Sequence, residues 1–278
     1  MSHFMDKNFL LYNDTAKKLF FDGADDAVLF NLTQIEDVSM NATVDNNEVL
    51  DAMQNVIMTI EKAKNMEIAG NASFFDMALL GAQWGSGVED SSATVKFAVP
   101  CFETYTYKAD ATTHELKHEI ATGSLGTGIA KYAYKLNKDG SIAKKYEYVA
   151  DTATADKFSM ATTGNKTTFT PPTGSQDGDM FLIAYEYEAN ETNKASRVVD
   201  NAEVSAKSGR LMIECLFRDI CNKEIMYYGY AVCDNAQVDG NVDVSLTTDG
   251  KHPFTIKAMP AYCAEEKNLL TFVIPDVA

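Results

Sequence analysis

Phe254-Thr-Ile256-Lys-Ala258, near the end of this 278-residue chain, alternates apolar and polar residues with a period of two. The same alternation runs through Val242-Asp-Val244-Ser-Leu246, and the turn-like Thr248-Asp-Gly250-Lys-His-Pro253 separates the two segments. A period of two places one set of side chains on a buried face and the other set in solvent. We therefore expect each segment to form a β-strand.

Further strand-like runs surround this pair. Arg210–Phe217 and Ile225–Val232 precede it, and the chain closes on Leu269–Ile274 before Pro275. Apolar, β-branched and aromatic residues dominate these runs, as they do in strands. The region from about 210 to 274 is therefore predicted to consist of consecutive strands.

The N-terminal third also predicts strands, with a polar loop between two of them. Ile35–Val44, Val56–Ile60 and Met66–Ala69 are the expected strands. Asp45–Asn55, which is acidic and rich in amides, separates the first two. Polar clusters of this kind between apolar runs are typical of loops.

One short helix is predicted directly after these strands. Ser73 and Asp76 have the spacing of a capping box, with Asp in place of the usual Glu. Phe74–Leu80 is largely apolar, and Gly81 stands where a helix would end. Because two turns with so much apolar surface need cover, we expect this helix to pack on a sheet.

The middle third predicts a hairpin and two more strands. Ile129–Leu136 and Lys144–Val149 flank Asp139-Gly140, and an Asp-Gly pair between alternating runs is a strong hairpin signal. Thr167–Thr170 and Met180–Tyr187 read as the next strands.

The chain shows no long linker, repeat or low-complexity tract that would divide it. The simplest prediction is one mainly β domain over residues 1–278. Its parts would be a strand–strand–helix element at about 35–81, an elaborated middle segment at about 105–200, and C-terminal strands at about 210–274. A hydrophobic content of 46% is enough for a substantial core.

Charge is the second strong signal. The formal net charge is −16, and residues 21–110 hold fifteen acidic residues against four lysines. Such a surplus argues against nucleic-acid affinity, because binding DNA or RNA needs cations that displace counterions. Strong net charge also keeps a protein dispersed, so charge alone leaves solubility and a DNA-repelling surface as alternatives.

Targeting and redox motifs are not evident. No signal peptide or uninterrupted apolar membrane span is recognised, so we expect a soluble protein made in the cytoplasm. Five cysteines form no C-x-x-C pair and are expected to be reduced, half-buried apolar residues.

His114-Glu115-Leu-Lys-His118 matches H-E-x-x-H, in which a helix brings two histidines to one zinc ion and Glu serves as the base. Leu116, His118 and Ile120 alternate with charged residues, however, which suits a strand as well as a helix. Thr122-Gly123 then ends the segment after little more than two turns.

The residues that would complete a zinc site are also missing from the expected places. Ala121 and Ser124 stand where a metzincin has Gly and His, although Glu147 or Glu186 remains open as a third ligand. A zinc peptidase is therefore the rival hypothesis and not the preferred one.

Other candidate motifs favour structural interpretations. Gly123–Gly128 lacks the Gly-Lys-Ser/Thr ending of a phosphate loop and precedes a strand, so it predicts a turn. Tyr227–Tyr230 suits a strand or a protein contact, and Asp22–Asp26 lacks the spacing of a calcium loop. No G-x-S-x-G elbow occurs. We expect no catalytic residue, metal or cofactor.

Three segments of the chain carry a resemblance. Gly229–Leu246 is similar to a run of paired strands, Thr247–Met259 to a closing strand, and Val56–Leu80 to a strand–strand–helix element. In their pattern and their order along the chain, these segments resemble the major tail tube protein of long-tailed, non-contractile bacteriophages.

The resemblance implies a β-sandwich or barrel with one short flanking α-helix. It also implies a structural virion protein, not an enzyme, that self-assembles into hexameric rings stacked into a tube. The genome would leave through the lumen during DNA ejection without specific binding, and acidic walls would repel its phosphates. A ring in which every subunit adds strands to one barrel would also remove unpaired sheet edges.

The resemblance further implies a site, partners and a location. The family's long loop between two N-terminal strands contacts the neighbouring ring. The partners would be other copies, tail terminator and tail-tip proteins, and a tape measure protein in the lumen, with no membrane. The protein would be assembled in the bacterial cytoplasm and reside in the virion tail. The predicted inter-ring residues are Asp45, Asn46, Asn47, Glu48, Asp51, Gln54 and Asn55.

Two alternatives make different predictions. Another β-rich virion protein, such as a capsid decoration or baseplate component, would form discrete oligomers and no open-ended tube. A zinc peptidase built on His114, Glu115 and His118 would bind zinc and lose it on His118→Ala.

Overall fold

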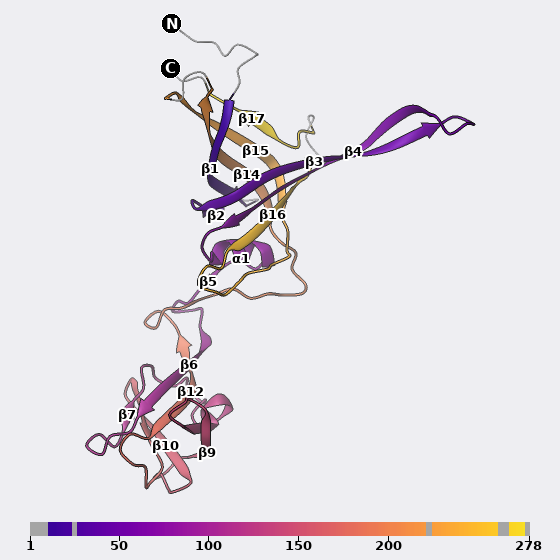
Figure 1. The fold of residues 1–278 in the computed structure, drawn as a ribbon. Coiled ribbons are helices and arrows are strands. Elements are labelled where there is room, and N and C mark those ends of the chain that lie inside the picture. Colours follow the sequence, from indigo (N-terminus) through magenta and orange to yellow (C-terminus); the bar gives the residue numbers. More distant parts are fainter. Residues whose placement is uncertain (1–10, 24–26, 221–223, 261–266, 276–278) are drawn as a thin grey trace. The chain divides into compact units, whose positions relative to one another are not determined.

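The chain folds into two compact units, which are each described separately. Unit 1 combines residues 1–88 with residues 198–278, and unit 2 consists of residues 89–197 (Figure 1). The predicted middle segment, about 105–200, overlaps unit 2, and the single domain over residues 1–278 stays a prediction. The computed structural model describes residues 11–23, 27–220, 224–260 and 267–275.

Both units are built mainly of strands, and the described residues contain one α-helix, so the predicted fold class is confirmed. The strands of unit 1 form one eight-stranded sheet that curls toward a closed barrel. They are β1 (Leu11–Asp22), β2 (Val28–Leu32), β3 (Ile35–Leu50), β4 (Val56–Ala72), β14 (Ser208–Asp219), β15 (Met226–Val238), β16 (His252–Ala258) and β17 (Thr271–Val273).

The sheet of unit 1 has the strand order β2-β1-β14-β15-β16-β4-β3, and β17 pairs with β15. The period-two pattern that decided the fold is confirmed in β16, where Phe254, Ile256 and Ala258 are buried while Lys257 is exposed. The same alternation places Leu211 and Ile213 of β14 in the core. Burial of these side chains is the main stabilising contribution to the unit.

The predicted strand over Val242–Leu246 is wrong. No strand is assigned between the end of β15 at Val238 and the start of β16 at His252. Leu246 is 89% exposed, so its side chain has no apolar face to bury against. Alternation alone does not form a strand when no neighbouring strand is there to pair with it.

Helix α1 spans Met77–Trp84, three residues later than its predicted start. The oxygen of Asp76 caps it by accepting a hydrogen bond from the Leu79 amide, at 2.8 Å. Ser73 is not the cap, because its hydroxyl donates to Glu36 on β3. Among the described residues, no helix is long and apolar enough to cross a membrane.

The predicted stop at Gly81 is also wrong, since the helix continues to a left-handed C-cap at Gly85. Gly81 is needed inside the helix because a Cβ there would lie 2.8 Å from the carbonyl carbon of Gly87. As predicted, α1 packs on the sheet, and Leu79 and Ala82 join the core.

Unit 2 contains a seven-stranded sheet of order β6-β12-β8-β9-β10-β11-β7 and a two-stranded ribbon of β5 and β13. A 3₁₀ helix, Gly128–Lys131, occupies the start of the strand predicted over Ile129–Leu136. The strands are β5 (Glu89–Asp90), β6 (Phe97–Thr106), β7 (His114–Glu115), β8 (Tyr132–Leu136), β9 (Ile142–Val149), β10 (Lys157–Thr163), β11 (Lys166–Thr170), β12 (Met180–Ala189) and β13 (Ser196–Arg197).

The predicted hairpin of unit 2 is confirmed between β8 and β9. Asp139 accepts a hydrogen bond from the Ser141 amide at 2.9 Å, and Gly140 has a φ of 84° that suits glycine. Unit 2 has its own aromatic core, in which Phe158, Phe169 and Phe181 are fully buried.

Candidate functional site

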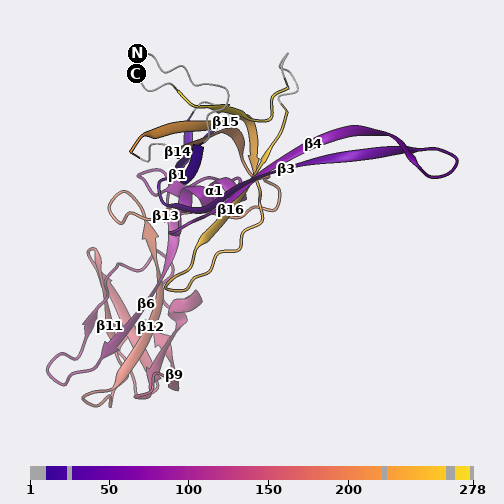
Figure 2. The same cartoon turned by 45° about the horizontal axis from the view of Figure 1, so that its top comes forward.

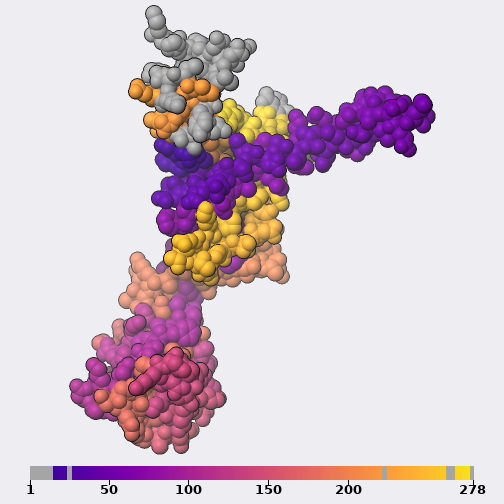
Figure 3. Space-filling model, viewed as in Figure 1, coloured from indigo at the N-terminus to yellow at the C-terminus, as the bar shows by residue number. Residues whose placement is uncertain are grey.

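A long β-hairpin leaves the sheet of unit 1 (Figure 2). Strand β16 pairs with β4 over Met66–Ala72 only, so beyond that point β3 and β4 pair only with each other. We call the distal part of this hairpin, Thr43–Asn65, the arm. In the space-filling view the distal end of the arm projects beyond the rest of unit 1 (Figure 3).

The arm corrects the predicted element boundaries. The strands expected over Val56–Ile60 and Met66–Ala69 are one continuous strand, β4. The predicted loop Asp45–Asn55 is strand as far as Leu50, and only the remaining five residues form the turn. The polar residues that looked like a loop are the exposed side chains of a two-stranded ribbon.

The turn at the tip of the arm is held by its own polar side chains. Asp51 accepts hydrogen bonds from the backbone amides of Met53 and Asn55, both at 2.8 Å, and from the Asn55 side chain at 3.1 Å. The hydrogen bonds from Asn55 hold the pKa of the Asp51 carboxyl below its usual value. Gln54 adopts a left-handed φ of 63°. These residues therefore fix the shape of the tip.

The seven predicted contact residues are thus divided between two places. Asp45, Asn46, Asn47 and Glu48 lie on β3 within the arm, and Asp51, Gln54 and Asn55 form the turn. Their contact with a neighbouring ring stays a prediction.

The sequence reasoning missed the apolar residues around that turn. Met53 is 82% exposed and Ile57 66% exposed, and four more large apolar side chains are about half exposed. Large apolar side chains that gather exposed on one segment mark an interaction site. The four further residues are Leu50, Val56, Met58 and Ile60.

The arm is also acidic. The arm contains Asp45, Glu48, Asp51 and Glu61 against Lys62 and Lys64 at its base, and no lysine or arginine occurs between positions 19 and 61. A partner surface therefore has to match both the apolar side chains around the turn and the acidic side chains of the arm.

A second feature of unit 1 lies where its sheet fails to close. Among the residues that the structure describes, strand β1 pairs with β2 only from Leu19 onward, and β3 pairs only with β4. Both strands therefore present an unpaired backbone edge, the feature through which sheets recruit further strands. We call the space between these edges the seam.

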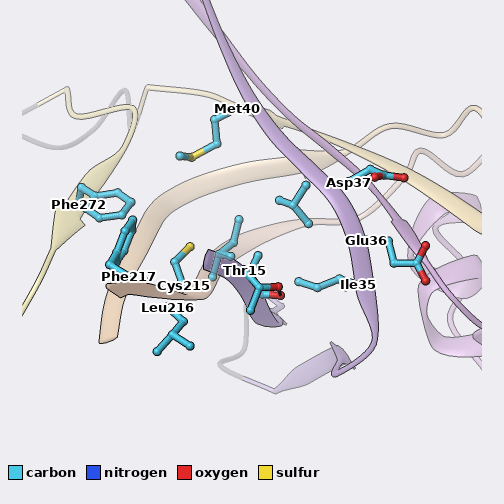
Figure 4. A pocket seen from close by; sticks show the side chains of 12 residues that line it. Thr15, Ile35, Glu36, Asp37, Met40, Cys215, Leu216, Phe217 and Phe272 are labelled. Atoms are coloured by element: carbon cyan, nitrogen blue, oxygen red, sulfur yellow. Dashed lines mark hydrogen bonds between the residues drawn. The ribbon is translucent and has the colours of Figure 1, made fainter. Parts of the chain in front are cut away.

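The seam contains a cavity of about 580 Å³ with a largely apolar lining. Figure 4 shows Met40 of β3 and Phe272 of β17 on the same side of β14 as Cys215 and Phe217. The rings of Phe217 and Phe272 pack edge to face, with centroids 5.7 Å apart.

The charges at the seam are not all acidic. Glu36 and Asp37 line the cavity, but both form ion pairs with Lys251 of the same unit. A shallower continuation of the seam is lined by Lys17 and Lys18 of β1. This end of the seam thus offers two cations.

The H-E-x-x-H segment does not form the helix that a zincin needs. His114 and Glu115 lie in the short strand β7, and His118 stacks on Tyr187 with ring centroids 4.0 Å apart. His114 instead lies 3.2 Å from Glu103. In the part of the chain that the structure describes, no three His, Cys, Asp or Glu residues are grouped to hold a metal ion.

Glu103 is the centre of a buried polar cluster that the sequence did not indicate. Its carboxylate accepts hydrogen bonds from the Tyr185 hydroxyl and, at 2.9 Å, from the Lys117 amide. Burial alone would raise the pKa of Glu103, but these bonds and the contact with His114 outweigh burial and lower it. Burial and the nearby carboxylate raise the pKa of Tyr185. The cluster ties β6 to β12 and to the segment after β7.

The remaining motifs have structural roles. In the glycine-rich stretch, Gly126 has a φ of 69°, as a turn requires, and a Cβ there would overlap the Tyr148 ring. Tyr228 and Tyr230 lie on β15 and are 42% and 38% exposed, with Lys17 placed over the Tyr228 ring.

Comparison with known proteins bears on the whole chain. A family model described as the YomU/Tube protein family matches residues 10–267, which span both units. A comparison with curated proteins gives no match. Because the family match covers far more than half of the sequence, the chain belongs to the YomU/Tube protein family.

Proposed function

We propose that the chain is the major tail tube subunit of a long-tailed, non-contractile phage, and that it forms hexameric rings stacked around a lumen that conducts DNA. The observation that carries this proposal is the arm, a long ribbon with an apolar tip and no partner in its own unit. The tube family match and the β-rich fold support the same function.

The open seam supports assembly through strands. Unpaired edges on β1 and β3 are a liability in an isolated protein, because they can template pairing with other chains. Strands supplied by other copies in the tube would cover such edges, as closure into a barrel does.

The arm supports contacts between rings. A ribbon that projects from its own sheet can contact a surface on another copy. That surface is a different part of the molecule from the ribbon itself. Such a head-to-tail contact does not close on itself, so it generates an open-ended filament. Under this proposal the residues at the tip, among them Asp51, Gln54 and Asn55, belong to the inter-ring contact.

The charge distribution supports passage of DNA without binding. Unit 1 contains 25 acidic and 12 basic residues, whereas unit 2 contains 15 and 12. An acidic surface facing the lumen would repel the phosphate backbone and keep the DNA mobile. A tape measure protein before ejection, and terminator and tip proteins at the ends, complete the proposed virion tail.

Negative-stain electron microscopy of the purified protein over a concentration series tests the proposal. We expect hollow tubes or stacked rings that become longer as concentration rises. Sedimentation velocity on the same samples separates this result from discrete oligomers, which would favour a decoration or baseplate protein instead. Stoichiometric zinc in a protein that does not polymerise would favour the peptidase.

A further inference from the structure

We propose that the seam of one copy is the receptor for the arm tip of another copy. The inference rests on the proposed function, because it names the surface that receives the assembly element. The apolar side chains at the tip would lie on the floor of the seam, and one strand of the arm would pair with the open edge of β1 or β3.

The arm tip exposes enough apolar surface to need a partner surface of comparable area. Leu50, Met53, Val56, Ile57 and Met58 are each at least half exposed. Together with Ile60 they expose on the order of several hundred Å² of apolar surface, as much as the largest patch on a typical monomer. A standard interface buries about 800 Å² per partner, so the arm alone supplies most of one side.

The seam offers matching chemistry. Its floor presents Cys215 and Phe217 of β14, and its walls present Met40 and Phe272. The cavity of about 580 Å³ is within the range in which proteins hold apolar groups. Beside it, the backbone groups of Leu11–Lys18 are unpaired on one edge and can bond to an added strand.

Charge favours the arm of a second copy as the occupant. Between Asp45 and Glu61 the arm has four acidic side chains and no basic ones, and Lys62 and Lys64 follow at its base. The continuation of the seam carries Lys17 and Lys18, and Lys251 forms ion pairs with both carboxylates of the seam, Glu36 and Asp37. The acidic stem of an inserted arm would therefore meet cations, and complementary charge fixes the orientation of an interface.

A cross-linking experiment between two distinguishable proteins tests the inference, because Cys215 already lines the seam. The donor protein carries Ile57→Cys together with Cys215→Ser, and the acceptor protein is wild type. The two are mixed above the assembly concentration and treated with a short bismaleimide. A mildly alkaline buffer is needed, because burial raises the pKa of the Cys215 thiol.

Two controls isolate the contact. An acceptor with Cys215→Ser lacks the seam thiol but keeps its other cysteines, so any product that remains comes from them. A donor with Ile142→Cys, in place of Ile57→Cys, carries a similarly exposed cysteine on β9 of unit 2, at 59% exposure. Circular dichroism on every variant verifies that it is folded, and Met58→Cys is a second donor position on the same tip.

The expected result is a dimer-sized product with Ile57→Cys or Met58→Cys that falls at least tenfold with either control. Tubes that form without this product would overturn the inference and leave the proposed function standing. The product in a sample with discrete oligomers and no tubes would support the arm and seam contact while the tube proposal fails. Folded donor and acceptor that give neither tubes nor product would overturn the inference.

Discussion

The two units have the same kind of interior and very different exteriors. Each is mainly β and has its own buried apolar cluster, with Ile213 and Ile256 in unit 1 and Phe169 and Phe181 in unit 2. Unit 1, however, also carries the arm and the seam, and its net charge is −13 against −3 for unit 2. The lysines of unit 2 are largely used within it, as in the pairs Lys135–Asp179 and Lys166–Glu115.

This difference indicates that the features needed for folding and those needed for assembly are distinct. A core is sufficient for a unit to fold, and both units have one. Unpaired strand edges and an exposed apolar tip do nothing for an isolated chain, and within the described residues the most extended features of this kind belong to unit 1. We infer that unit 1 makes the contacts of the polymer and that unit 2 is not required for them.

The largest expected effect comes from shortening the arm. Residues 45–63 are removed, and Val44 is joined to Lys64, its partner across the ribbon, by an Asn-Gly turn. We expect a folded protein that no longer forms tubes, since the apolar tip is gone. Electron microscopy and sedimentation velocity measure the loss.

The matched counterpart removes unit 2. Residues 89–197 are replaced by a short Gly-Ser link between Val88 and Val198. We expect tubes to persist with an unchanged critical concentration. Loss of tubes here, in a protein whose circular dichroism remains that of a β fold, would contradict the separation of the two roles.

Core substitutions sharpen the comparison by unfolding one unit at a time. Phe181→Ala is expected to destabilise unit 2 by about 3–5 kcal/mol, and Ile213→Ala to destabilise unit 1 by about 2–5 kcal/mol, because both side chains are fully buried. Trp84, the single tryptophan, lies in α1 of unit 1. Its fluorescence during urea denaturation should shift for Ile213→Ala only, and an equal shift for Phe181→Ala would indicate one cooperative domain.

Acid should affect unit 1 before unit 2. Buried His252 donates from Nε2 to the side-chain oxygen of Gln83, 2.8 Å away, accepts at Nδ1 from the Asp76 amide, and stacks its ring on Phe75. Burial lowers the pKa of His252 below the ordinary 6.5, while the Asp76 carboxylate opposes the shift. The unfolded chain then binds a proton that the folded chain does not, so this contribution to the stability of unit 1 is lost as pH falls below 6.5.

The carboxylate of Glu103 sets the corresponding window for unit 2. Its lowered pKa means that its stabilising contribution is fully present above the ordinary 4.5 and is lost as pH falls from there through the lower pKa of the folded state. Thermal unfolding followed by Trp84 fluorescence and by far-ultraviolet circular dichroism separates the two windows. His252→Asn should remove the loss of stability below pH 6.5, and Glu103→Gln should remove the loss below pH 4.5. Coincident midpoints at every pH would contradict the assignment.

The smallest expected effect is that of Asp51→Ala. The substitution removes three hydrogen bonds from the turn of the arm and leaves both cores untouched. We expect amide exchange at the tip to become a few-fold faster, with a modest rise in the concentration needed for assembly and no change in the urea midpoint. Glu48→Ala, on the stem of the arm, is the control for loss of charge.

The sequence predicted those elements whose pattern is set locally. Strand β16 and the hairpin around Gly140 follow from period-two alternation and from turn chemistry, so both could be located in advance. The start of α1 could not, because the hydroxyl of Ser73 is used by Glu36, a residue 37 positions away in the sequence. Tertiary contacts of this kind leave no local signal.

The sequence drew attention to the polar part of the arm and missed its apolar part. The polar residues from Asp45 to Asn55 drew attention to the arm, yet Asp51 and Asn55 are occupied in holding its turn. Ile57 and Met58 lie in an apolar run that was predicted only to be a strand, and such runs are normally buried. Only the pairing of β4 with β3 alone, beyond Met66, shows that these side chains are exposed.

The ribbon of β5 and β13 has a consequence for engineering. Glu89 and Arg197 are direct partners across this ribbon, so the chain leaves unit 1 and returns to it through two points that are one strand spacing apart, about 5 Å. Any folded domain whose two ends lie equally close can be inserted between those points without stretching the host. A polymer of such chimeras would display its cargo at the repeat of the subunits, as an ordered array on a protein scaffold.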